Sequence, residues 1–279
     1  MERVEWELIG SDGTKLFVRE WKPKLDQPSV ERGVVCLLHG MGEHGDRYAH
    51  VAARLTAEGF AVLAMDQQGH GRTAGSRGHM PSIETTVSHV GTLLEAASER
   101  YPGLPRYLYG HSMGGNVVLN AAIRLKPDLN GVIASSPWLR LAFSPPAAQL
   151  WVGRIIARVA PGLPQSTGLK PEQLYRQGYP HVSPIEGDPL NHTRITVKTF
   201  LEIQTAGEWV LNHIQELNIP LLLLHGNADQ VTSYAASAEA AKKLGDCCRF
   251  ISWDGGFHEL HNDLEAERVL DSIVEWLNH

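Results

Sequence analysis

The chain has 279 residues and a net charge of −6, with 43% hydrophobic and 20% charged residues. This length accommodates one α/β domain plus an insertion, and the composition is that of an ordinary globular protein. The mild acidity and the scattered basic residues exclude a nucleic-acid-binding surface. No run reaches the roughly 18 apolar residues of a membrane span. The charged segment 1–6 lacks the apolar stretch of a signal peptide, so we expect a cytoplasmic protein.

The first half of the chain alternates strand-like and helix-like segments. The segments before and after the turn at 10–13 predict an antiparallel hairpin. Continuous apolar runs further on predict strands that are buried on both faces of a sheet. The expected strands are 4–8, 16–21, 34–38 and 60–65, and the expected helices are 48–58 and 85–100.

The alternation continues in the second half. The expected strands are 107–109, 132–135, 220–224 and 249–253, and the expected helices are 115–124, 234–244 and 264–277. Strands that alternate with helices imply a mostly parallel central sheet flanked by helices on both sides. The predicted fold class is therefore α/β.

Residues 138–211, which we call the cap insertion, break this rhythm. They are proline-rich at first, then polar, and contain no clear strand. We interpret them as a helical cap between two strands of a core formed by 1–137 and 212–279. One face of a helix in this cap is apolar: Ala148, Trp151, Val152, Ile155, Ile156 and Val159. That face either packs on the core, or lines an acyl pocket or contacts a membrane surface.

The most informative motif is Gly-His-Ser-Met-Gly at 110–114. It follows the apolar run 107–109 and precedes the helical segment 115–124, which is the strand–turn–helix context of a G-x-S-x-G nucleophile elbow. Glycines permit the tight turn because a Cβ there would collide with neighbouring backbone. Ser112 is therefore the candidate nucleophile. The alternative is a small residue in an ordinary turn.

A nucleophilic serine needs a base, and the base needs an orienting acid. Enzymes with this elbow carry them in the order serine, acid, histidine. Asp229 follows the strand 220–224, and His258 follows the strand that ends at Trp253. Both lie at carboxyl ends of strands, where ligands bind in open α/β sheets. The co-occurrence of three such residues in this order is more specific than any single motif.

Both partners have alternatives. Asp229 is also suited to cap the helix that starts near Ser233. Asp254 is a rival acid, but it shares a loop with His258 and is better explained as a turn residue. His261 and other histidines near the C-terminus compete with His258 as the base.

An oxyanion hole needs two backbone donors. The N–H of Met113, directly after the nucleophile, is the first candidate. The second is the N–H of Met41, because Gly40 and Gly42 give the loop after strand 34–38 the freedom to aim it. The alternative is that these glycines are ordinary turn residues.

Two other motifs are set aside. Residues 69–74 match a loose G-x-G-x-x-A dinucleotide pattern, but no helix follows them. In 258–261 the second histidine comes one residue too early for the zinc motif H-E-x-x-H. The cysteines Cys36, Cys247 and Cys248 form neither a disulfide framework nor a zinc spacing. We therefore expect a reducing compartment, no metal and no cofactor.

Several segments together resemble the monoacylglycerol lipase and lysophospholipase group of α/β-hydrolases. They are HGMGEHGDRY at 39–48, DQQGHGRTAGSRGH at 66–79, GHSMGGN at 110–116, HGNADQVTS at 225–233 and FHELHND at 257–263. The resemblance covers nearly the whole catalytic core and fades in the cap insertion. It implies the α/β-hydrolase fold, with substrate choice decided in the cap.

The resemblance implies roles for individual residues. It implies the triad Ser112, Asp229 and His258 with the amides of Met41 and Met113 as oxyanion donors. It further implies that Glu43 and His261 hydrogen-bond the glycerol end of the substrate, with His44 and His111 as supports. For Glu43 a structural ion pair with Arg47 is an equal alternative.

The implied reaction is hydrolysis of a monoacylglycerol to fatty acid and glycerol through an acyl-enzyme, with a small lipid or ester as the substrate and no nucleic-acid partner. The same triad also serves carboxylesterases, lysophospholipases, thioesterases and acyltransferases. A non-catalytic binding protein of this fold would need none of the three residues. The motifs do not define an oligomeric state, and the cap is the segment expected to make any transient membrane contact.

Overall fold

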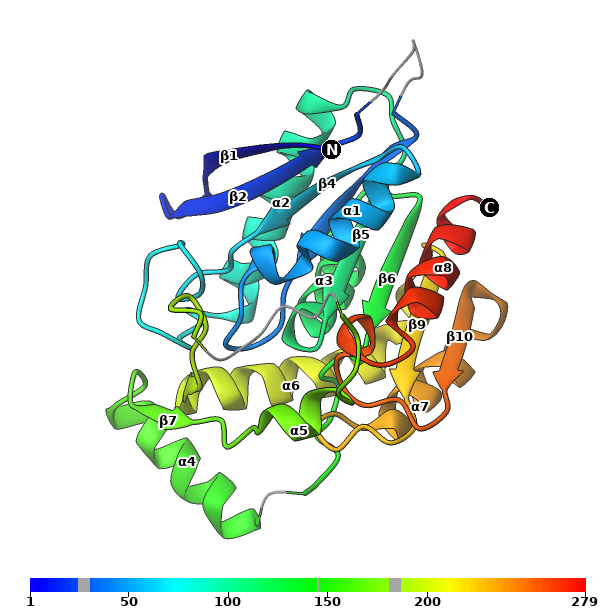
Figure 1. Ribbon diagram of the computed structural model, residues 1–279. Helices are drawn as coiled ribbons and strands as arrows, with labels where there is room; N and C mark the ends of the chain where they lie inside the picture. The colour runs from blue at the N-terminus through cyan, green and yellow to red at the C-terminus, as the bar shows by residue number, and fades with distance from the viewer. Residues whose placement is uncertain (25–30, 145, 181–186) are drawn as a thin grey trace.

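A central sheet organises the described part of the chain, residues 1–24, 31–144, 146–180 and 187–279 of a computed structural model (Figure 1). Its eight strands are β1 (Glu2–Ile9), β2 (Lys15–Lys22), β3 (Gly33–Leu38), β4 (Phe60–Met65), β5 (Arg106–His111), β6 (Gly131–Ser135), β9 (Leu221–Gly226) and β10 (Cys248–Trp253). They lie in the order β1-β2-β4-β3-β5-β6-β9-β10. β2 is antiparallel to β1 and β4, and all other neighbours are parallel. The prediction of a mostly parallel sheet is confirmed.

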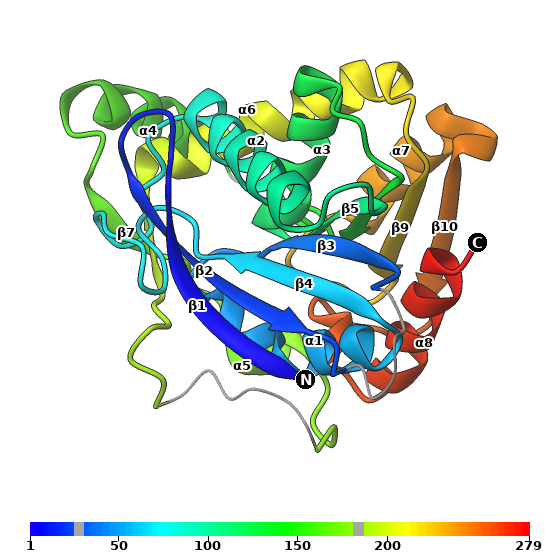
Figure 2. The same ribbon diagram turned by 90° about the horizontal axis from the view of Figure 1, so that it is seen from above.

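Helices cover both faces of the sheet (Figure 2). On one face lie α1 (Ala49–Ala57) and α8 (Ala266–Leu277), and on the other lie α2 (Ile83–Arg100), α3 (Met113–Leu125), α6 (Val197–His213) and α7 (Tyr234–Leu244). Successive strand residues point to opposite faces, so an apolar strand fills both layers. In β3, Cys36 and Leu38 pack towards α2 and α3, while Val35 and Leu37 pack towards α1 and α8.

The expected helix starts differ slightly from the observed ones, because local hydrogen bonds set them. The helix expected at 48–58 corresponds to α1, and the 3-10 helix η1 (Gly45–Tyr48) directly precedes it. The helix expected at 85–100 already begins at Ile83, because the Ser82 hydroxyl accepts a hydrogen bond from the amide of Thr85 at 3.1 Å.

The cap insertion lies beyond the carboxyl ends of the strands, between β6 and β9 (Figure 1). Besides α6 it contains α4 (Ala147–Val159), α5 (Pro171–Leu174), and the strands β7 (Pro164–Ser166) and β8 (Arg194–Thr196). β7 and β8 form an antiparallel ladder that the sequence did not indicate. The boundary drawn at 211 falls inside α6, whose Ala206, Val210 and Leu211 belong to the main core.

The apolar face of α4 does not pack on the core. Trp151 is 63% exposed and Val159 is 82% exposed, while Val152 and Ile156 line a cavity. The side chain of Ala148 lies outside the described residues. Among the helices that the structure describes, none is long and apolar enough to cross a membrane.

Candidate active site

Ser112 occupies a strained turn between β5 and α3. Its φ of 53° and ψ of −115° are unusual for a residue with a side chain. Two glycines make room for this turn. A Cβ on Gly110 would lie 2.2 Å from the carbonyl oxygen of Gly114, and a Cβ on Gly114 would lie 2.2 Å from that of Leu38. The turn thus depends on both glycines of the pentapeptide.

The structure brings Ser112, His258 and Asp229 into one hydrogen-bonded chain. Nε2 of His258 lies 2.9 Å from Oγ of Ser112, and Nδ1 of His258 lies 2.7 Å from Oδ2 of Asp229. All three side chains are buried or nearly so. The rival Asp254 lies elsewhere, exposed and bonded to the side-chain amide of Asn227 at 2.9 Å.

The carboxylate of Asp229 is held in place by several donors. Its Oδ1 accepts from the amides of Val231 at 2.7 Å and Thr232 at 3.1 Å, and its Oδ2 accepts from the Thr232 hydroxyl at 2.8 Å. Burial by itself raises the pKa of Asp229, but the charge of His258 and hydrogen bonds from His225 and His258 lower it below its ordinary value. The acid therefore stays ionised.

The same interaction acts on His258 in the opposite sense. Burial disfavours the imidazolium, yet the charge and hydrogen bond of Asp229 hold the pKa of His258 above its usual value. His225, which the sequence did not single out, completes this arrangement. Its Nε2 lies 3.1 Å from Oδ2 of Asp229 and its Nδ1 lies 2.8 Å from the hydroxyl of Ser237. The only sequence signal for the contact of His225 with Asp229 was the position of His225 at the end of an apolar strand.

The β3 loop, residues 39–44, packs directly on the serine. A Cβ on Gly40 would lie 3.2 Å from Cβ of Ser112, and Gly40 and Met41 line the same cavity as Ser112. Gly42 has a φ of 80°, and its carbonyl oxygen accepts from the amide of His192 in the cap at 2.8 Å. Met113 is the first residue of α3.

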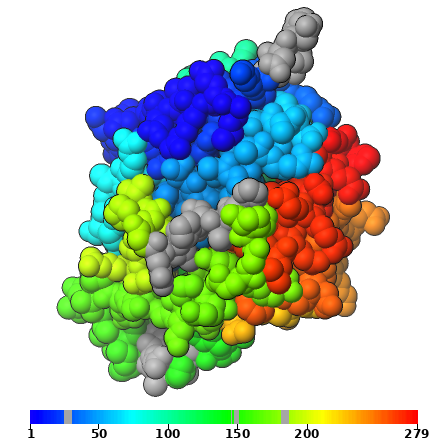
Figure 3. All heavy atoms as spheres, in the orientation of Figure 1, coloured from blue at the N-terminus to red at the C-terminus, as the bar shows by residue number. Residues whose placement is uncertain are grey.

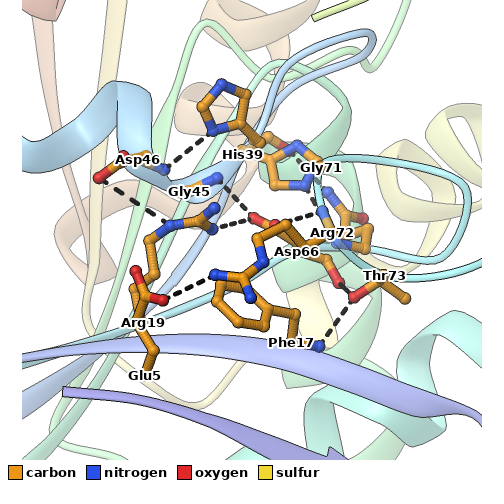
Figure 4. Close-up of polar contacts among 12 residues, drawn as sticks. Glu5, Phe17, Arg19, His39, Gly45, Asp46, Asp66, Gly71, Arg72 and Thr73 are labelled. Carbon is orange, nitrogen blue, oxygen red and sulfur yellow. Dashed lines mark hydrogen bonds and ion pairs between the residues drawn. The ribbon is translucent and has the colours of Figure 1, made fainter. Parts of the chain in front are cut away.

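Asp66 connects three segments of the chain through hydrogen bonds (Figure 4). It follows β4 and is fully buried. Its Oδ1 accepts from Nη1 of Arg19 at 2.6 Å and from the amide of Gly45 at 2.8 Å, and its Oδ2 accepts from the amide of Arg72 at 2.8 Å. One carboxylate thus joins β2, the start of η1 and the loop after β4.

Glu43 forms the ion pair that the sequence left as an alternative. Its Oε2 lies 2.5 Å from Nη1 of Arg47, and its Oε1 accepts from the Tyr48 hydroxyl at 2.7 Å and from the amide of Gly40 at 2.5 Å. Burial opposes ionisation, but the neighbouring Arg47 charge lowers the pKa of Glu43 below its ordinary value. Glu43 also lines the cavity beside Ser112.

His261 lies beside this group but is fully buried. Its ring stacks on Tyr48 at 4.7 Å between centroids and meets His111 edge-on at 4.9 Å. Burial lowers the pKa of His261 well below its usual value. His261 is not among the described residues that line the cavity. Its contact with a substrate therefore stays a prediction. His44 is bonded to Asp188 of the cap, at 2.7 Å.

A cavity of about 680 Å³ opens from Ser112 into the cap insertion. Most of its wall is apolar and comes from the cap and from its borders: Trp138, Leu141, Phe143, Val152, Ile156, Leu174, Ile195, Val197, Phe200, Leu201 and Val231. Its polar end holds Glu43, His111, His258 and Glu259. The cap, which forms the green lower part of the molecule in Figure 3, thus supplies most of the apolar wall of the cavity beside the serine.

The sheet topology and the serine turn define an α/β-hydrolase. Comparison with known proteins agrees. Residues 29–265 match the family model Hydrolase_4, described as serine aminopeptidase, S33, and the chain belongs to this family. It is a serine hydrolase.

The individual relatives resemble the chain over nearly its full length. The monoacylglycerol lipase of Mycolicibacterium smegmatis is 30% identical, covering 99% of this chain and 97% of the relative. The monoglyceride lipase of Homo sapiens is 30% identical, covering 97% and 88%. The crystal structure of Paleococcus ferrophilus monoacylglycerol lipase superposes with a TM-score of 0.83 at 32% identity, covering 94% and 98%. The resemblance stated from the motifs is confirmed.

Proposed function

We propose that Ser112, His258 and Asp229 act as a catalytic triad that hydrolyses carboxylic esters. The hydrogen-bonded chain from Oγ of Ser112 through His258 to Asp229 is the observation that carries this proposal. His258 removes the proton of Ser112, and Oγ attacks the ester carbonyl. Asp229 keeps the proton of His258 on Nδ1 and stabilises the imidazolium that forms.

The oxyanion is bound by the amides of Met41 and Met113. Met41 lies in the loop that lines the cavity beside Ser112, and Met113 begins α3, where free amides and the helix dipole favour negative charge. His258 then protonates the leaving alcohol. Water, activated by the same histidine, releases the acid from the acyl-enzyme. Every step uses groups of this chain.

We propose monoacylglycerols as the substrate class. All three relatives above carry this substrate in their names, as monoacylglycerol or monoglyceride. Pockets of about 300–1,000 Å³ hold one drug-sized molecule, so 680 Å³ accommodates one acyl chain with its glycerol and not three chains. The acyl chain occupies the apolar wall of the cap, and the alcohol occupies the polar end.

The charge of the polar end predicts a preference for neutral head groups. Two carboxylates, Glu43 and Glu259, share one cation, Arg47, and leave one net negative charge. At an effective dielectric constant of about 20 and a distance of about 10 Å, that charge disfavours a phosphate by roughly 1.7 kcal/mol, more than tenfold. We expect 1-oleoylglycerol to be hydrolysed at least tenfold faster than its 3-phosphate and than trioleoylglycerol, measured as oleate release from matched micelles. Equal rates would contradict the monoacylglycerol assignment but not the esterase chemistry.

We also propose that α4 contacts lipid surfaces. Trp151, Ile155 and Val159 are exposed on the helix whose Val152 and Ile156 line the cavity. Arg154 and Arg158 are exposed beside them and would attract anionic lipids. An apolar, basic helix of this kind delivers a lipid substrate from an interface directly to the chamber.

The contact is tested by co-sedimentation with phosphatidylcholine–phosphatidylserine vesicles. The double variant Trp151→Ser/Val159→Ser should bind several-fold less than the wild type, because it removes exposed apolar area from α4 alone. The matched control is Leu125→Ser, which alters an exposed apolar residue at the end of α3. Equal loss of binding in both variants, or none in the double variant, would rule out α4 as the contact.

A further inference from the structure

One buried cation joins the loops that carry two parts of the site. Arg47 lies at the end of η1 and is 1% exposed. Its Nη1 lies 2.5 Å from Oε2 of Glu43 in the β3 loop. Its Nη1 and Nη2 also reach the two carboxylate oxygens of Glu259, at 3.1 and 2.8 Å. Glu259 directly follows His258, at the end of the β10 loop, residues 254–259.

Both carboxylates extend the connection to the backbone or to a further side chain. Glu43 accepts a hydrogen bond from the amide of Gly40, next to the proposed donor Met41. Glu259 accepts from the side-chain amide of Asn262 at 2.7 Å. A continuous polar path therefore runs from the backbone of the β3 loop, through one guanidinium, to the residue beside the histidine.

We propose that Arg47 and Glu259 are positioning residues, which lock the β3 loop and the β10 loop in the relative placement that ester hydrolysis requires. This inference rests on the proposed function. Catalysis needs the histidine, the serine and the oxyanion donors at fixed mutual distances, and a misplacement of 1 Å can cost about 100-fold in rate.

The physical reason is the burial of three charges. Glu43 and Glu259 are each 4% exposed, and buried charges are tolerated only when they are paired and hydrogen-bonded. If either loop moves away, it leaves a buried charge without its partner. The bidentate guanidinium of Arg47 thereby makes displacement of one loop costly for the other, which a single-point lysine contact would do less well.

The pair also acts on the base electrostatically. The groups that contact His258 from other elements are Asp229, Ser112, Thr232 and His111. The charges of Glu259 and Glu43 act on it as well. Since the negative charge of Glu259 stabilises the imidazolium, its removal lowers the pKa of His258. The acid limb of the rate profile then moves to lower pH, which a purely structural role would not produce.

The test compares Glu259→Gln, Arg47→Lys and the matched control Glu20→Gln. Glu20 is also fully buried and hydrogen-bonded, to Arg100 at 2.5 Å and to Tyr101 at 2.6 Å, but it lies on β2, away from the cavity. The readouts are kcat and KM for p-nitrophenyl butyrate, the pH profile, and hydrogen exchange of the β3 loop.

We expect Glu259→Gln to lower kcat by about tenfold or more with little change in KM, since a misplaced loop costs rate and not binding. Exchange in the β3 loop should rise, because the hydrogen bonds of Glu259 to Arg47 connect it to that loop, and the acid limb should move to lower pH. Arg47→Lys should show a smaller loss of kcat. Glu20→Gln should lower the melting temperature and leave kcat and β3-loop exchange as in the wild type.

Unchanged kcat and unchanged β3-loop exchange in Glu259→Gln would overturn the inference. An equal effect of Glu20→Gln would also overturn it, because that result would show that kcat falls through a general loss of stability and not through the Arg47–Glu259 pair. Wild-type protein without esterase activity would instead overturn the proposed function, and the exchange measurement would still decide whether the two loops are coupled.

Discussion

A Ser112→Ala variant is expected to lose hydrolysis of p-nitrophenyl butyrate by about 10⁵-fold or more, while it melts within a few degrees of the wild type. The loss follows because, among the cavity-lining residues that the structure describes, Ser112 places its hydroxyl within hydrogen-bond distance of His258, and removal of a triad nucleophile has effects of this size. The fold is retained because alanine tolerates the φ of 53° about as well as serine does.

The matched control is Ser136→Ala. Ser136 is also buried and also has a positive φ, of 44°, and it follows β6 at the same edge of the sheet. We expect this variant to keep the activity of the wild type and to react with a fluorophosphonate probe, which Ser112→Ala should not do. Labelling or hydrolysis by Ser112→Ala at the wild-type rate would remove Ser112 from the mechanism.

The sequence predicted those parts of the site that local context specifies. The elbow was recognisable because an apolar strand and a helix flank the pentapeptide, and the structure places Ser112 in that turn. Asp229 and His258 could be predicted because parallel strands deliver their carboxyl ends to one edge of a sheet. The sequence favours Asp229 over Asp254 as the acid without excluding Asp254. The structure distinguishes the two, because Asp229 contacts His258 whereas Asp254 contacts Asn227.

Contacts between distant segments could not be predicted in this way. In the sequence, Glu259 belongs only to the incomplete zinc motif at 258–261. Its pairing with Arg47 joins residues 212 positions apart. His225 ends an apolar strand, and its contact with Asp229 depends on how the following loop folds back. The apolar face of α4 was equally compatible with a buried helix, because periodicity shows that a face is apolar and not what covers it.

Asp229→Asn is expected to lower kcat for p-nitrophenyl butyrate by about 10⁴-fold, as loss of the acid does in other triads. The asparagine oxygen can still accept from the amides of Val231 and Thr232, so its NH₂ replaces Oδ2 and faces Nδ1 of His258. Nδ1 must then accept a hydrogen bond, which places the imidazole proton on Nε2, where the base has to take the proton of Ser112. Asp254→Asn is the matched control and should retain full activity, since that carboxylate is exposed and bonded to Asn227.

The pH profile separates this tautomer effect from a general loss of structure. Asp229 raises the pKa of His258, and the reaction needs neutral His258, so wild-type kcat/KM falls as the pH drops through that raised value. Without the charge of Asp229 the pKa of His258 falls, and the acid limb of the residual activity should lie at lower pH. An Asp229→Asn enzyme with an unshifted acid limb and near-normal kcat would show that another group orients the histidine. A large loss of kcat in Asp254→Asn would then identify that group as the rival carboxylate.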